Sequence, residues 1–203
     1  MLPAFYAIII GRLTQGRSAI RIHDVFSAIK EINETLSLTN EPDKLVNAAL
    51  DTFSQALKIE CCWIQTISDR KSKKLTLAAE RGFTPEIRSE VAALDLRHRF
   101  SESIIGAGTK IIIPDLSRDG LYGLPSFQKA GYRWMVAVPM MTYRPYGIFG
   151  AASRRKKSLD KNTADLVTVI AAMIAGGLSK AYLSSAARGP SPAAGKFSAT
   201  VEV

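Results

Sequence analysis

Cysteine and histidine are scarce in this chain, which has two of each among 203 residues. Cys61 and Cys62 are adjacent in an apolar segment, and neighbouring residues of a strand point to opposite faces, so we expect no disulfide between them. Together with His23 and His98 they show no metal-ligand spacing, so we predict no metal site. The absence of a disulfide framework is typical of a reducing cytoplasm, which we predict as the location.

Long apolar runs are also missing. The clearest run, Leu2–Ile10, is far shorter than the ~20 residues that span a bilayer, and no positive charge precedes it as in a signal peptide. We therefore predict no membrane span and interpret residues 1–23 as a poorly structured leader. A remnant of a longer upstream anchor is the alternative.

Acidic residues are fewer than basic ones, 18 against 27, and the formal net charge is +9. Such an excess attracts polyanions over long distances without specifying nucleic acid. The 47% of hydrophobic residues and the chain length fit one globular domain with a sizeable core.

The pattern of apolar residues predicts helices and hairpin strands. We expect helices at 24–38, 42–58, 84–94 and 161–187, a short helix within 122–130, and strands at 59–68, 74–81, 110–114, 132–140 and 146–153. Strands that pair as hairpins favour an α+β fold, with an antiparallel sheet of five to six strands and helices on its faces. The Pro-, Gly-, Ala- and Ser-rich segment 188–203 is expected to be a disordered tail.

The two terminal helices each carry an apolar stripe. In the first helix the stripe could be a core face or a dimer seam, since it covers less than two heptads. We predict a homodimer whose interface contains residues of both helices: Val25, Ile29, Ile32, Leu36, Ile174 and Leu178.

Four segments, in this order and spacing, resemble a GAF domain over roughly Asp24–Ala187. They are AAERG (Ala78–Gly82), IIIPDLSRD (Ile111–Asp119), AGYRWMVAVPM (Ala130–Met140) and YGIFGAAS (Tyr146–Ser153). The resemblance implies a GAF/PAS-like fold in which the first strand lies beside the last. It departs from the family at Trp134, where the family's strand motif has Ser.

The resemblance also allows several family functions to be weighed. Asp115–Ala130 has no cysteine for a covalent bilin, and the signature of cyclic-nucleotide-binding members is missing. His98 lies between Arg97 and Arg99, which favours an exposed loop histidine over a haem ligand. The basic runs at 70–74 and 154–157 would lie at opposite ends of the sheet without aromatic residues between them, so we predict no specific nucleic-acid binding.

The remaining expectation is a small-molecule site, with no catalytic residues and an unidentified ligand or cofactor. We predict a cavity floored by Trp134, Val136 and Val138, and completed from the loops by Phe100, Asp115 and Tyr122. It would lie between the sheet and the irregular segments 95–109 and 115–124.

The leading hypothesis is a non-catalytic sensor that couples ligand binding to the terminal helices, as a homodimer that acts on a signalling partner. One alternative is a thiol enzyme of the free methionine-(R)-sulfoxide reductase type, which would need reactive cysteines. The other is a scaffold whose cavity is filled by its own side chains.

Overall fold

A five-stranded antiparallel sheet forms the centre of the computed structural model, which describes residues 22–69, 74–122, 124–155 and 161–187. The strand order is β2-β1-β5-β4-β3, so the first strand pairs with the last, as predicted. The strands are β1 (Cys61–Asp69), β2 (Lys74–Arg81), β3 (Ile111–Ile113), β4 (Trp134–Met141) and β5 (Pro145–Ser153). Three predicted segments lie outside the described residues: most of the leader, the hairpin loop at 70–73 and the tail at 188–203.

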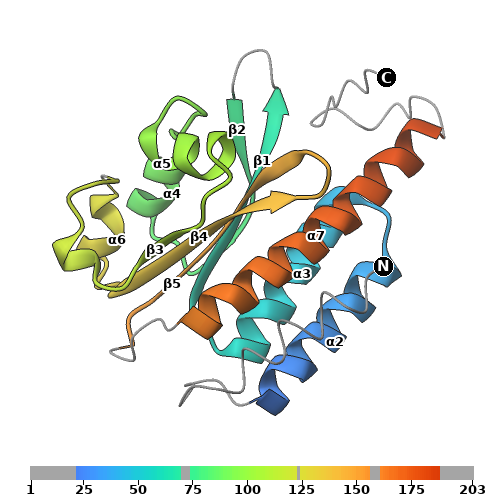
Figure 1. The fold of residues 1–203 in the computed structure, drawn as a ribbon, viewed down its shortest axis with the longest axis horizontal. Coiled ribbons are helices and arrows are strands. Elements are labelled where there is room, and N and C mark those ends of the chain that lie inside the picture. Colours follow the sequence, from blue (N-terminus) through green and yellow to red (C-terminus); the bar gives the residue numbers. More distant parts are fainter. Residues whose placement is uncertain (1–21, 70–73, 123, 156–160, 188–203) are drawn as a thin grey trace.

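Helices cover both faces of the sheet (Figure 1). One face carries two long helices, α3 (Pro42–Leu57) and α7 (Lys161–Ala187), and a third, α2 (Ile22–Leu38), packs on both of them. The other carries short segments: α4 (Pro85–Ala92), α5 (Arg99–Ser101), the π-helical turn η1 (Glu102–Gly106), the 3-10 turn η2 (Leu116–Arg118) and α6 (Pro125–Lys129). The predicted α+β class is confirmed.

The start of α4 shows how local sequence sets these boundaries. Thr84 is in an extended conformation and its side-chain oxygen accepts a hydrogen bond from the backbone N–H of Ile87, while Pro85 occupies the first helical position. Pro42 begins α3 in the same way, and Lys58 ends that helix in the left-handed conformation, at φ 53°.

The sheet separates two hydrophobic cores. The first core lies under α2, α3 and α7 and receives the even-numbered residues of β4, from Trp134 to Met140. The second core lies under the short segments and receives Met135 and Ala137 from the same strand. Because both faces are covered, β4 is apolar on both sides and has no polar alternation to mark its orientation.

The predicted dimer seam is wrong for four of its residues. Ile32, Leu36, Ile174 and Leu178 are all buried in the first core of a single chain. Ile29 is partly buried against the same core, and the side chain of Val25 lies outside the described residues. The stripes of α2 and α7 are apolar because α3 and the sheet cover them, as a core face requires.

Within the described residues, one helical stretch, Ala164–Ser184, is long and apolar enough to cross a membrane by length and composition. Here the helix packs against β4 and β5 and buries one face in the first core. Packing of α7 against the sheet therefore accounts for the high hydropathy of this helix.

Candidate functional site

The structure does not bring the six predicted ligand-binding residues together. Trp134, Val136 and Val138 point into the first core, toward α3 and α7, and are buried there. Phe100 and Tyr122 belong to the opposite side of the sheet. The predicted cavity floor is therefore wrong. The residues of β4 that face the short segments are Met135 and Ala137, which alternate with the predicted ones and point to the opposite face of the sheet.

The other three predicted residues, Phe100, Asp115 and Tyr122, do gather on one side of the molecule. Asp115 and Tyr122 line an open pocket of about 450 Å³. The ring of Tyr122 contacts Phe100 edge to face, with centroids 6.0 Å apart, and Phe100 is buried behind it. This pocket, here called the edge pocket, lies along β3, the strand at one edge of the sheet.

The edge pocket combines apolar and charged side chains from one short stretch of chain. Its lining consists of Ile112, Ile113, Pro114, Asp115, Arg118, Asp119, Leu121 and Tyr122. Ile112 and Leu121 are large apolar residues left 38% and 48% exposed. Such exposed apolar side chains beside charged groups are typical of a surface that binds something.

Hydrogen bonds fix the two carboxylates of this stretch. Asp115 Oδ1 accepts hydrogen bonds from the backbone N–H and the hydroxyl of Ser117, at 3.0 and 2.6 Å. These bonds, with Arg118 and Arg133 nearby, lower the pKa of Asp115 and keep it ionised. Asp119 Oδ1 accepts from the N–H of Leu121 at 3.1 Å, and no described cation forms an ion pair with Asp119.

The interior of the second core is filled by aromatic rings. Trp63 contacts Phe83 and Phe127, with ring centroids 5.7 and 5.2 Å away, and Phe127 contacts Tyr132. Trp63 also lies directly over Gly150: a Cβ at that position would be 2.2 Å from the indole ring. The second glycine of YGIFGAAS, Gly150, is therefore explained by the indole ring of Trp63 that packs against it.

Three buried polar atoms of this half of the molecule have no partner among the described residues. They are Trp63 Nε1, Gln65 Oε1 and Ser101 Oγ. Gln65 donates from Nε2 to the carbonyl of Val91 in α4 at 2.9 Å, which places its side chain on the side of the short helices. Sequence reasoning missed Gln65, although a glutamine within an apolar strand is a visible signal.

Both thiols are buried in opposite cores, Cys61 in the second and Cys62 in the first, with 0% of either residue exposed. Burial raises the pKa of Cys61 to about 12 and also raises the pKa of Cys62. A nucleophilic thiolate needs exposure and a lowered pKa, so neither cysteine has the surroundings of a reactive thiol.

His98, weighed above as a haem ligand, has a structural role. Its Nδ1 accepts a hydrogen bond from the N–H of Phe100 at 3.3 Å and caps α5. No group of three or more metal-ligating side chains occurs in the part of the chain that the structure describes.

The fold and its edge pocket define a class: an α+β domain with an antiparallel sheet between long terminal helices and short pocket-forming segments. A family model described as GAF domain matches residues 39–179, and the chain belongs to that family. This confirms the resemblance seen in the sequence.

Solved structures of low sequence identity share the fold. A GAF domain from a phosphoenolpyruvate-protein phosphotransferase of Coxiella burnetii has a TM-score of 0.66 at 13% identity, over 81% of this chain and 98% of that one. Free methionine-R-sulfoxide reductase from Neisseria meningitidis, in complex with its substrate, has 0.65 at 13%, over 82% and 96%.

A domain of a putative two-component sensor histidine kinase protein from Sinorhizobium meliloti is similar with a TM-score of 0.57 at 17% identity, over 70% of this chain and 94% of that one. No curated protein matches the chain. These structural similarities establish the fold and do not identify a ligand.

Proposed function

We propose that this chain is a non-catalytic signalling domain that binds a small molecule in the edge pocket and passes the change to helix α7. The observation that carries the proposal is the pocket itself, because it joins exposed apolar side chains to two fixed carboxylates. Several structural neighbours are parts of a methyl-accepting chemotaxis protein, a putative two-component sensor histidine kinase protein and a cyanobacteriochrome, which supports a signalling role. The free thiols support a cytoplasmic setting.

The pocket lining indicates the chemistry of the ligand. Ile112, Leu121 and Tyr122 offer apolar area to a flat or compact body. Asp119 has no ion-pair partner among the described residues, so it would accept a hydrogen bond from an amine or amide of the ligand. Arg118 already contacts Asp115, and both would have to rearrange to bind an anionic group.

One ion pair connects the segment directly before β3, the strand that borders the edge pocket, to α7. Lys110, directly before β3, contacts the carboxylate of Asp165 in the first turns of α7, and both side chains are only about one-third exposed. Ligand binding beside β3 would change the position of Lys110 and so favour one arrangement of the helix over another. Ligand-dependent signalling needs such a differential contact, and the Lys110–Asp165 pair is our proposal for it.

Native mass spectrometry of freshly purified protein tests the proposal. We expect a retained or added small molecule on the unmodified chain, and its loss in Leu121→Trp, where the larger side chain fills the pocket. Leu183→Trp is the matched control, because Leu183 is similarly exposed, at 56% against 48% for Leu121, but lies on α7. Equal retention by the two variants would contradict a ligand in the edge pocket.

A scaffold without any ligand is the second candidate, and the filled second core favours it. Trp63, Phe83 and Phe127 occupy space on the side of the sheet where the sequence analysis placed the cavity. The two candidates differ in one result: a scaffold binds no small molecule in any arm of the experiment above.

The thiol-enzyme alternative has the least support, although one structural neighbour is a reductase. Its chemistry needs accessible sulfur, and Cys61 and Cys62 are buried with raised pKa values. A turnover assay on free methionine sulfoxide with Cys61→Ser and Cys62→Ser tests it. We expect no thiol-dependent turnover.

A further inference from the structure

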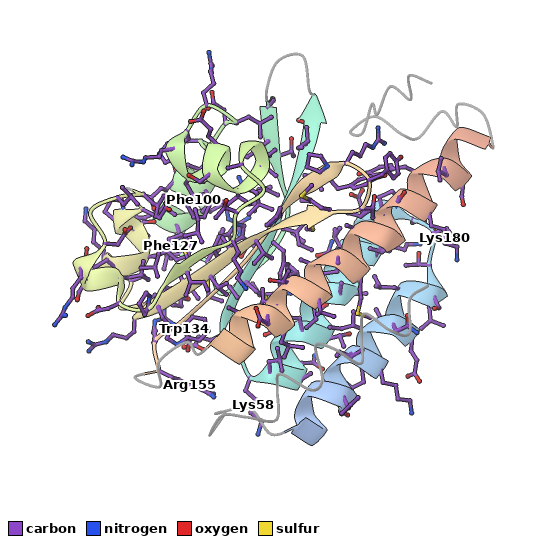
Figure 2. The ribbon with its side chains drawn as sticks, viewed as in Figure 1. Lys58, Phe100, Phe127, Trp134, Arg155 and Lys180 are labelled. Carbon is purple, nitrogen blue, oxygen red and sulfur yellow. The ribbon has the colours of Figure 1, made fainter. Side chains whose placement is uncertain are left out.

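Basic side chains gather at the end of the sheet where β4 begins and β5 ends. Five exposed residues, here called the basic end, come from separate parts of the chain: Lys58, Lys129, Arg133, Arg154 and Arg155. Figure 2 shows Lys58 and Arg155 at the same end of the molecule as Trp134, the first residue of β4.

Backbone contacts hold these segments together. The N–H of Arg133 donates to the carbonyl of Ser153 at 2.8 Å, and Arg154 Nε donates to the carbonyl of Ala130 at 2.9 Å. The guanidinium of Arg154 also lies over the ring of Tyr132, 4.1 Å from its centroid. These contacts hold Arg133 and Arg154, which directly precede β4 and follow β5, against the end of the sheet.

The described residues leave the basic end with an excess of positive charge. None of its five side chains forms an ion pair with a carboxylate among the described residues, whereas Arg81, Arg88 and Lys110 elsewhere each do. Glu60 lies among them, where its oxygens accept from the hydroxyl of Ser153 and the N–H of Arg154, and its single negative charge offsets one of the five positive charges. Clustered, unpaired cations attract an anionic partner and orient it as it approaches.

We propose that the basic end is a docking surface for an acidic segment of a partner protein. Guanidinium groups bind carboxylates with two parallel hydrogen bonds, and three of the five residues are arginines. Nucleic acid is a poorer fit, because Tyr132 is buried beneath Arg154 and offers no exposed ring for base stacking. A lipid surface also fits less well, because the exposed large apolar residues of the described chain belong to other segments.

Binding of a fluorescent poly-glutamate peptide to the full chain, followed by anisotropy, tests this surface. We expect Arg133→Glu with Arg155→Glu to weaken binding at least about tenfold, because both reversals place like charges against the peptide. Lys74→Glu with Lys180→Glu is the matched control: it changes the net charge equally at exposed positions away from the basic end, since Lys74 pairs with Asp69 at the far end of β1. We expect a loss of less than about twofold there.

Equal losses in the two double variants would overturn the proposal, because net charge alone would then explain binding. Tighter binding of a DNA duplex or of phosphatidylserine vesicles than of the peptide, lost in the same Arg133 and Arg155 variant, would also overturn it. Circular dichroism confirms that each variant is folded. The retained or added ligand of the edge pocket is measured separately, so the two proposals stand or fail independently.

Discussion

The two faces of the sheet are closed in different ways. On the first face, α3 and α7 cover the strands and α2 packs on these two helices; α7 contributes aliphatic residues such as Ile170, Ile174 and Leu178. On the second face, short interrupted segments enclose a connected cluster of aromatic rings and the edge pocket. Continuous helices leave little room for anything but packing, whereas short segments leave edges and irregular backbone where a ligand can bind.

The largest expected effect concerns the helix layer. Ile174→Asp places a carboxylate in the first core without a partner and should cost several kcal/mol, enough to unfold a marginally stable domain. Ala172→Asp, on the exposed side of the same helix, should change stability by less than about 0.5 kcal/mol. Thermal melts followed by circular dichroism compare the two. Dissociation of a folded Ile174→Asp dimer into folded monomers would instead restore the dimer-seam interpretation.

The second face can be tested through Gly150. Gly150→Ala would bring a Cβ against the indole ring of Trp63 and should destabilise the domain by about 2 kcal/mol. Gly176→Ala, at an open helical position, should stabilise it by about 0.5 kcal/mol. Urea titration measures both changes. A neutral Gly150→Ala would mean that the ring cluster has room to move.

The thiols, one in each core, should make both faces sensitive to alkali. Because burial raises the pKa of Cys61 from 9.0 to about 12, the unfolded chain loses this proton first as the pH rises above 9.0. The free energy of unfolding should therefore fall, by about 1 kcal/mol for this thiol at one pH unit above 9.0. Urea titrations at pH 7 and 10 compare the unmodified chain with Cys61→Ala, which should lose less stability. Equal losses would contradict a buried, protonated Cys61.

The smallest effect concerns the buried hydroxyl groups. Ser101→Ala removes an oxygen without a described partner and should be neutral or stabilising by up to about 1 kcal/mol. Ser153→Ala removes a hydroxyl bonded to Glu60 and should cost about 1 kcal/mol. The same urea titration separates them. If Ser101→Ala costs as much as Ser153→Ala, Ser101 has a partner in solution, such as a bound water.

Much of the fold could be predicted from sequence because its signals are local. The bounds of β2 and α7, and the cap of α4 by Thr84 and Pro85, follow from turn residues and apolar period. The face on which Trp134 lies could not be predicted, because β4 is apolar on both sides and the pattern is the same in either orientation. The partners of Ile32 and Leu36 depend on long-range packing, which a short stripe does not specify.

The edge pocket was predictable in part. Asp115 and Tyr122 follow an apolar strand and a proline, where an irregular segment is expected, and the structure places both in the pocket lining. Arg118, Asp119 and Leu121 were missed as lining residues because nothing in their spacing distinguishes a pocket from a solvated turn. Their convergence depends on η2 and on the exposed edge of β3.

Two-dimensional NMR of the labelled chain, titrated with a library of small amines and amides, tests the central claim most directly. The account predicts that a binder shifts the amide signals of residues 112–122 and, through Lys110, those around Asp165 in α7. Shifts confined to the surroundings of Trp63, Gln65 and Ser101, with residues 112–122 unchanged, would contradict it and place the ligand inside the second core.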